Sequence, residues 1–158
     1  MRELKFDTGI EVLQVNDGAE LRFNPSDPGL YSRFVAAQGK LNALEEQFEA
    51  EAREIGSGEL DEEAKTRRML VMLDEYDRQA KDVLTDIFGQ QNDFDAILSG
   101  LSCFAVTASG DSVLANFLLA IAPIIDEGAQ RMANADISKA VAEANANRAA
   151  RRAAAKAK

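Results

Sequence analysis

The sequence predicts a mainly α-helical protein, with an N-terminal β-hairpin of two or three short strands followed by a bundle of four or five helices. Three observations support this fold class. Apolar and polar residues alternate on both sides of Asp17-Gly18, which is typical of paired strands. Over residues 28–88 the apolar residues recur in steps of three and four, which is typical of amphipathic helices. Between residues 112 and 133 they cover most of the helical circumference, as in a buried helix.

The predicted strands lie within residues 2–24. Thr8-Gly9 is expected to form a first turn and Asp17-Gly18 a second, because a type I′ turn needs two central residues with positive φ. Two or three strands cannot bury both faces by themselves, so they must pack on helices or pair with another sheet edge. The alternating apolar residues are Leu4, Phe6, Ile10, Val12, Ala19, Leu21 and Phe23.

Two long helices are predicted next, over residues 28–55 and from about residue 60 to 88. Asp27 is the expected N-cap of the first, and Pro28 suits its first helical position. Gly56-Ser57-Gly58 ends this helix, and Gly89 supplies the C-cap of the second. A link this short favours an antiparallel helical hairpin. The first helix carries an apolar stripe formed by Leu30, Phe34, Ala37, Leu41, Leu44, Phe48, Ala52 and Ile55.

The rest of the chain predicts a helix capped by Asn92 or Asp93, a break at residues 108–111, and a core helix over residues 112–133. Pro123 should bend this core helix or mark an overlap of two helices. We therefore expect one helical domain with its hairpin over residues 1–134. Residues 135–158 form an Ala-rich basic tail, which is expected to be either helical or disordered and to order on a partner.

Charge is unevenly distributed along the chain. The net charge is −9, made up of −13 over residues 1–134 and +4 over residues 135–158. An acidic body repels nucleic acid and anionic membranes, and the basic tail has no aromatic residue on which a base can stack. The apolar run 113–125 is too short to span a membrane, and we find no secretory signal. The sequence predicts a protein of the cytoplasm that binds neither nucleic acid nor membrane.

Catalytic chemistry has little support in the composition. The chain has no histidine, and its single cysteine, Cys103, lies in an apolar context. Histidine-dependent nucleophilic sites and His/Cys zinc sites are therefore excluded. The acidic residues 59–63 and 74–77 are interpreted as a helix start and as ion pairs on a solvated face. We expect no enzyme activity, no cofactor and no metal.

The expected partners are proteins. The apolar stripe exceeds what one small helical layer can cover, which predicts a homo-oligomer or a bound partner. Asn116, an amide within the most apolar helix, is interpreted as a specificity device inside the core or at an oligomer seam. The candidate protein-binding residues are thus Leu30, Phe34, Leu41, Leu44, Phe48 and Asn116.

The order of elements and short motifs over most of residues 8–133 resembles tail assembly chaperones of tailed bacteriophages. The motifs are Phe23-Asn-Pro-Ser-Asp-Pro28, Asp86-Ile-Phe-Gly89 and Asn116-Phe-Leu-Leu-Ala-Ile-Ala-Pro-Ile-Ile125. The resemblance implies a largely helical, homo-oligomeric accessory protein of the host cytoplasm. Such a protein coats the tape measure protein and helps to recruit tail tube subunits. Residues 135–158 have no counterpart in it. The alternative is an acidic anti-defence protein that mimics DNA and inhibits a host nuclease.

Overall fold

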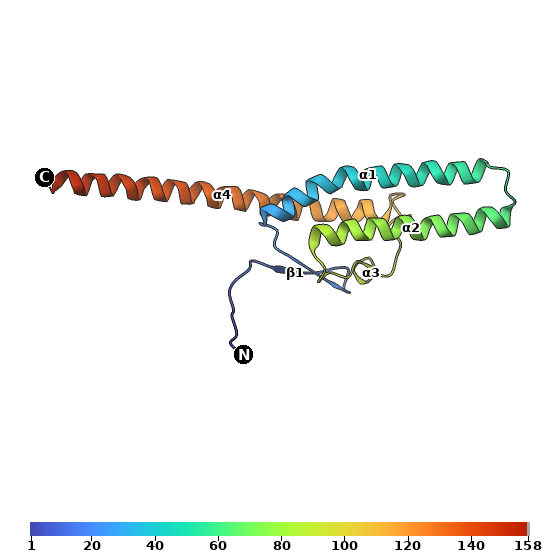
Figure 1. The fold of residues 1–158 in the computed structure, drawn as a ribbon, viewed down its shortest axis with the longest axis horizontal. Coiled ribbons are helices and arrows are strands. Elements are labelled where there is room, and N and C mark those ends of the chain that lie inside the picture. The colour runs from blue at the N-terminus through green and yellow to red at the C-terminus, as the bar shows by residue number, and fades with distance from the viewer. Residues whose placement is uncertain (158) are drawn as a thin grey trace.

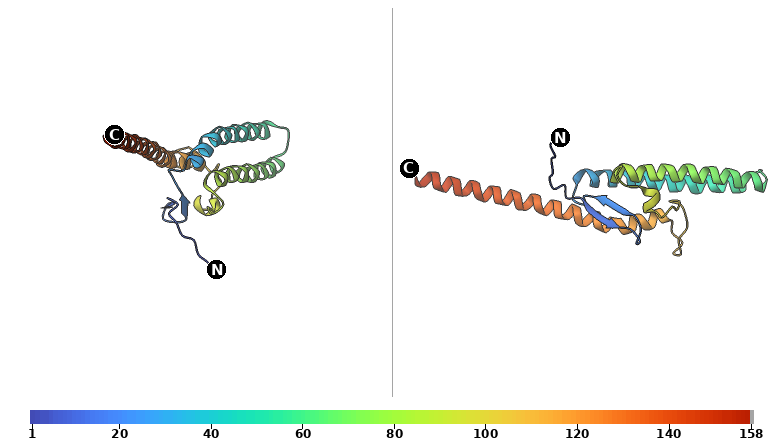
Figure 2. Two further views of the ribbon diagram at one scale, coloured as in Figure 1. Left: turned by 60° about the vertical axis from the view of Figure 1, so that its left-hand side comes forward. Right: turned by 90° about the horizontal axis from the view of Figure 1, so that it is seen from below.

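The computed structural model describes residues 1–157 and confirms the mainly helical fold with an N-terminal hairpin. The helices number four in this part of the chain, at the lower end of the expected range. Figures 1 and 2 show a central body from which two helical extensions point in opposite directions. The elements are β1 (Glu11–Gln14), β2 (Glu20–Phe23), α1 (Pro28–Ser57), α2 (Glu62–Phe88), α3 (Phe94–Ile97) and α4 (Val113–Lys156).

The hairpin has two strands, paired antiparallel with Glu11 opposite Phe23. Its turn lies one residue earlier than predicted, because Asn16 and Asp17 are the residues with positive φ, at 50° and 59°. The Gly18 N–H closes the turn by donating to the Val15 carbonyl at 2.9 Å. A third strand around Leu4 and Phe6 does not form. Residues 1–10 are exposed and have no ladder partner.

Helices α1 and α2 form the predicted antiparallel pair (Figure 1). Helix α1 continues two residues beyond the predicted end, through Gly56 and Ser57, and Gly58 is its C-cap. Asp27 caps α1 by accepting from the Gly29 N–H at 2.9 Å. Asp61 caps α2 by accepting from the Ala64 N–H at 2.8 Å. Gly89 follows α2 with a φ of 108°, a value that favours glycine. These caps are local sequence signals, so the ends of the two helices in the α1–α2 hairpin follow from residues close to them in the chain.

Helix α3 is much shorter than the sequence predicts. Asp93 is its N-cap, but Ser99 and Gly100 adopt positive φ values of 57° and 72°, which end the helical path. The next residues form a loop whose turn coincides with the break expected at residues 108–111. There the Thr107 N–H donates to the Asp111 carbonyl at 2.9 Å.

Helix α4 continues far beyond the predicted core helix. Ser112 caps its start, Pro123 lies inside it, and no break separates the apolar half from the Ala-rich tail. Of the two states expected for the tail, the structure has the helical one. Residues 133–157, which we call the helix arm, are all exposed and extend away from the body (Figures 1 and 2).

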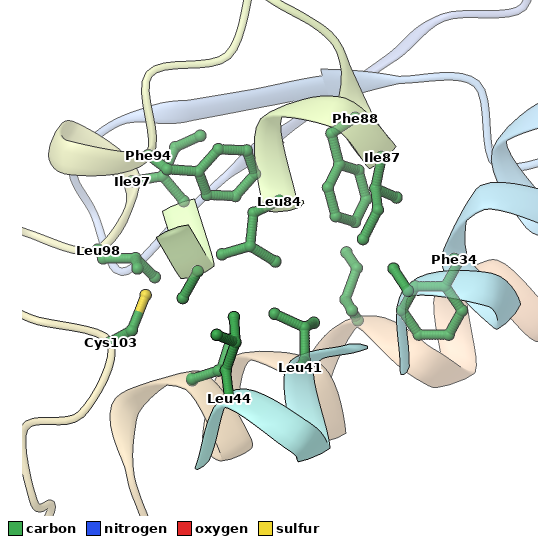
Figure 3. Packing of buried hydrophobic residues seen from close by; sticks show 14 of the residues in the cluster. Phe34, Leu41, Leu44, Leu84, Ile87, Phe88, Phe94, Ile97, Leu98 and Cys103 are labelled. Carbon is green, nitrogen blue, oxygen red and sulfur yellow. The ribbon is translucent and has the colours of Figure 1, made fainter. Parts of the chain in front are cut away.

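The core brings the hairpin, both long helices, α3 and α4 together (Figure 3). Phe88 is central to it, because its ring lies 5.2 Å from Phe23, 5.8 Å from Phe94 and 6.0 Å from Phe117. Gly128 allows α4 to touch the chain before α1, since a β carbon there would overlap the Pro25 carbonyl. These contacts place β2 and α4 on the α1–α2 pair.

Within the described residues, α4 alone is long and apolar enough to cross a membrane by length and composition. Its most apolar window has a mean hydropathy of 1.3 and is 22% buried. The core helix of a globular protein passes the same test, and Leu114 and Ile125 in α4 are fully buried. The finding is therefore weak evidence for a membrane span.

Candidate protein-binding surfaces

The apolar stripe of α1 lies in the core of its own chain. Leu30, Phe34, Leu41 and Leu44 are between 1% and 8% exposed. Phe48 is half-buried, stacked on Phe104 at 4.7 Å and edge-on to Tyr76 at 5.9 Å. Other parts of the same chain cover this stripe, so its contact with a partner stays a prediction.

Asn116 is half-buried and bonds to a loop instead of a neighbouring helix. Its Nδ2 donates to the Thr107 Oγ1 at 2.8 Å, and Thr107 Oγ1 in turn bonds to the Asp111 carbonyl. The amide therefore ties the loop before α4 to the first turns of that helix. Within one chain it does not fix the register between helices.

A long groove between α1 and α2 remains open. Glu45 of α1 faces the start of α4, because the Ser112 Oγ donates to its carboxylate at 2.8 Å. Ala43 and Gln47 line the groove, and each is two positions from Glu45, which is about 200° around the helix. The groove therefore lies on the side of α1 away from the start of α4. Two pockets that share Lys40, Val83 and Asp86 form the section nearer the β-hairpin, and a third pocket lies further along the same two helices.

The section nearer the β-hairpin, which we call the proximal groove, has a low floor. Small residues, Ala36, Gly39 and Ala43, line it from α1, and Val83 lines it from α2. No atom lies within 4 Å of a β carbon built on Gly39, so the space above it is free. The rim is charged, with Arg33 and Lys40 on α1 and Asp82 and Asp86 on α2.

The section near the tip of the helical hairpin, which we call the distal groove, is acidic. It continues the proximal groove, since Glu51 and Glu54 lie four and seven residues after Gln47 on the same face of α1. Its lining includes the apolar side chains Ile55, Leu60, Val71 and Met72, the four carboxylates Glu51, Glu54, Glu59 and Glu75, and the single basic side chain Arg68.

The negative charge of this section acts on a nearby phenol. Burial raises the pKa of Tyr76 above its usual value, and the carboxylates of Glu51 and Glu75 raise it further. A cation placed in the distal groove would relieve this repulsion. The chain supplies only Arg68 there, so the groove favours a basic ligand over an acidic one.

The helix arm is the other unpartnered surface. Ile137 and Val141 are 63% and 55% exposed on one face, and Arg148, Arg151 and Arg152 follow on the same face. Near the start of the arm, Arg131 of α4 pairs with Glu11 of the β-hairpin at 3.6 Å. From residue 133 to residue 157 every residue is exposed, so no described part of the chain buries the apolar residues of the arm.

Reactive or metal-binding groups do not gather in the described residues. No group of three or more His, Cys, Asp or Glu side chains there is arranged to hold a metal ion. Asp77 accepts from the Cys103 N–H at 2.7 Å and from the Lys81 ammonium at 2.8 Å, so this pair supports the loop before α4. Burial raises the pKa of the Cys103 thiol to about 12, with Asp77 adding to the effect. Such a thiol is a poor nucleophile at neutral pH.

Comparisons with protein-family models, with curated proteins and with solved structures found no match.

The groove is not among the surfaces that the sequence predicts. Its signal was present, because Ala36, Gly39, Ala43 and Gln47 follow one another in steps of three and four beside the apolar stripe. The pattern of one helix shows which face is apolar, whereas a groove also needs the partner helix to form its second wall.

Proposed function

We propose that this protein is a bacteriophage tail assembly chaperone that binds apolar helical segments of a tape measure protein in the host cytoplasm. The proximal groove is the observation that supports this function. Small residues on α1 allow the backbone of a bound helix to approach closely, and Val83 offers apolar contact from α2. Recognition of an amphipathic helix in an apolar groove is a common mode of peptide binding.

The charged rim supports an oriented client. One wall carries Arg33 and Lys40, and the other carries Asp82 and Asp86, so a client helix with acidic and basic flanks would fit in one orientation. Burial of the client's apolar face provides the main free energy, and the flanking charges provide specificity. A net charge of −9 keeps the complex soluble while the apolar client is held.

The acidic side chains are less suited to a DNA mimic. In the helical hairpin, basic residues interrupt the carboxylates and pair with them, as Arg67 does with Glu63 and Lys65 with Glu62. A mimic of duplex phosphates needs continuous rows of unpaired negative charge. The same surface therefore favours the chaperone over the anti-defence alternative.

The experiment measures binding of a fluorescent amphipathic peptide, taken from a tape measure protein, by anisotropy. We expect Gly39→Leu to weaken binding at least tenfold, because the side chain would occupy the proximal groove, where a β carbon on Gly39 meets no atom within 4 Å. Gly56→Leu is the matched control, since Gly56 also has free space around it and lies outside the groove lining; its affinity should equal that of the wild type.

Salt distinguishes the two functions. Binding driven by apolar burial should change little between about 0.05 M and about 0.5 M NaCl, where the Debye length is only a few ångströms. Equal affinity of Gly39→Leu and the wild type, or no binding of the peptide at all, would contradict the proposal. Salt-sensitive binding to a basic nuclease would support the alternative.

A further inference from the structure

The helix arm carries two kinds of side chain in sequence along one face. Ile137, Val141 and Ala144 come first, and Arg148, Arg151 and Arg152 follow. All of them are exposed. The basic part, from Arg148 to Lys156, extends over about 12 Å at 1.5 Å per residue. An isolated helix with an exposed apolar stripe and a basic row lacks the partner that would cover it.

The distal groove has the complementary features. Its floor is apolar, with Ile55 and Met72 almost buried and Val71 at 68% exposure. The four glutamates around this floor outnumber the single arginine. Along α2 the groove runs from Arg68 to Glu75, about 11 Å at the same rise per residue. The acidic section of the groove and the basic row of the helix arm therefore match in length and in charge.

The two surfaces cannot meet within one chain. Figures 1 and 2 show the helix arm and the tip of the helical hairpin at opposite ends of the molecule. Because α4 is one continuous helix from Val113 to Lys156, the arm leads away from the distal groove of its own chain. A contact between them needs a second copy.

We infer that the basic helix arm of one copy docks in the distal acidic groove of another copy, so that the chains associate head to tail. Charge complementarity, matched lengths and the opposite positions of the two surfaces favour a second copy as the occupant of the groove. This inference goes beyond the proposed function, because the client is placed in the proximal groove. Each copy presents one arm and one groove, so the interface is heterologous and builds open chains or rings.

The association is expected to depend strongly on salt. Alanine-rich helices bury little apolar area per residue, so the charges provide much of the attraction. Sedimentation velocity across about 5 to 200 µM protein at about 0.03 M NaCl should give a mean mass that rises above the 17.2 kDa of one chain. At about 0.5 M NaCl, where the charges are screened, the mass should return to that of one chain.

Two charge-reversed variants test the contact itself. The arm variant carries Arg148→Glu, Arg151→Glu and Arg152→Glu, and the groove variant carries Glu51→Lys and Glu54→Lys. All five positions are exposed, and circular dichroism checks that each variant keeps its helix content. We expect each variant alone to remain at 17.2 kDa, because each has lost one half of the interface.

Mixing the two variants gives the decisive result. The basic arm of the groove variant fits the acidic groove of the arm variant, and the reversed arm of the arm variant fits the reversed groove of the groove variant. The mixture should therefore associate with the two variants in alternation, and its mean mass should rise above 17.2 kDa. A chain that carries all five substitutions should associate with itself again. A wild type that stays monomeric at low salt would overturn the inference. Association of either variant alone to the same extent as the wild type would also overturn it, by showing that another surface joins the copies.

Discussion

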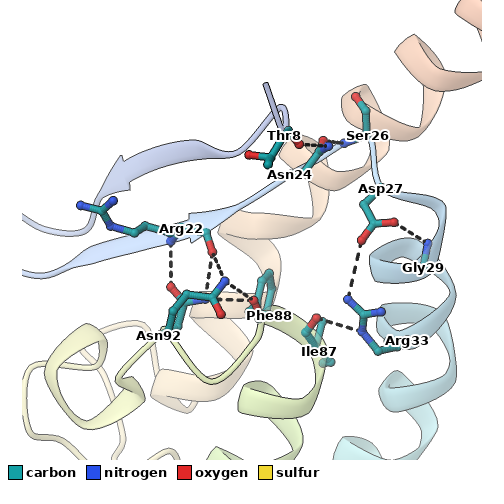
Figure 4. Close-up of polar contacts among 11 residues, drawn as sticks. Thr8, Arg22, Asn24, Ser26, Asp27, Gly29, Arg33, Ile87, Phe88 and Asn92 are labelled. Carbon is teal, nitrogen blue, oxygen red and sulfur yellow. Dashed lines mark hydrogen bonds and ion pairs between the residues drawn. The ribbon is translucent and has the colours of Figure 1, made fainter. Parts of the chain in front are cut away.

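The side chain of Asn92 binds both backbone polar groups of Arg22 in β2. Its Oδ1 accepts from the Arg22 N–H at 2.8 Å, and its Nδ2 donates to the Arg22 carbonyl at 2.9 Å (Figure 4). The same Nδ2 also donates to the Phe88 carbonyl at 3.0 Å, near the end of α2. Asn92 is 3% exposed and is the one buried polar side chain in the described residues. It therefore acts as a clamp between the β-hairpin and the helices.

Replacing this amide should destabilise the fold. We expect Asn92→Ala to lower the free energy of unfolding by about 2 kcal/mol or more, because three hydrogen bonds of a buried side chain are lost. Urea denaturation followed by circular dichroism measures the change. Gln90→Ala, at an exposed neighbouring position, should stay within about 0.5 kcal/mol of the wild type. A similar loss in both variants would show that the clamp is not specific.

Gly128 should not tolerate a side chain. A β carbon at this position would overlap the carbonyl oxygen and the ring of Pro25, so Gly128→Ala must push α4 away from the chain before α1. We expect a loss of about 1 to 3 kcal/mol, despite the better helix propensity of alanine. Gly39→Ala is the matched control, since a β carbon there meets nothing within 4 Å. It should stabilise the protein by about 0.5 to 1 kcal/mol.

Phe34 is expected to matter for folding. It is 4% exposed in the core between the helices (Figure 3), so Phe34→Ala should cost about 3 kcal/mol or more in the free energy of unfolding. Val35→Ala, at the next position but 50% exposed, should change it by about 0.5 kcal/mol or less. A Phe34→Ala variant that stays stable and loses only client binding would show that the apolar stripe is part of the binding surface.

The buried thiol makes the stability depend on alkaline pH. Burial, and then Asp77, raise the pKa of Cys103 from 9.0 to about 12. Between these values the unfolded chain releases the thiol proton and the folded chain keeps it, so stability falls as the pH rises. The slope from this one group is about 1.4 kcal/mol per pH unit. Below pH 9 its contribution is fully present.

Comparison with Cys103→Ala isolates the effect of the thiol. The variant should lose less stability than the wild type between pH 9 and pH 10.5 in parallel urea titrations. In the wild type, maleimide should label Cys103 at pH 8 far more slowly in buffer than in denaturant, because the thiolate is disfavoured and the side chain is fully buried. Rapid labelling of the native protein would contradict both the burial and the raised pKa.

Local signals in the sequence were sufficient for the helical hairpin. The caps Asp27, Gly58 and Gly89 and the three-and-four spacing act within a few residues of chain, so their structural consequences can be predicted locally. The shift of the β-turn to Asn16-Asp17 and the early end of α3 at Ser99 were not predictable in this way. Both depend on residues other than glycine that adopt positive φ.

The candidate surfaces were harder to predict, because periodicity identifies an apolar face without identifying what covers it. The stripe from Leu30 to Phe48 has the same pattern whether another chain or its own chain buries it. The structure shows that its own chain does so. The proximal groove appears only when α1 and α2 are paired. The charge difference between the helix arm and the body was clear from the sequence, but their opposite directions needed the continuous path of α4.

Because α4 is one continuous helix, its buried half influences how the helix arm unfolds. The first turn of an isolated helix forms with difficulty, and short helices in water are therefore marginal. Here the buried half of α4, with Leu114, Ile121 and Ile125, is a permanent nucleus for every residue that follows it. The arm can add or lose turns only from its free end. Amide protection should consequently decline step by step from Gly128 towards the C-terminus, and limited proteolysis should shorten the chain from that end and stop at the body.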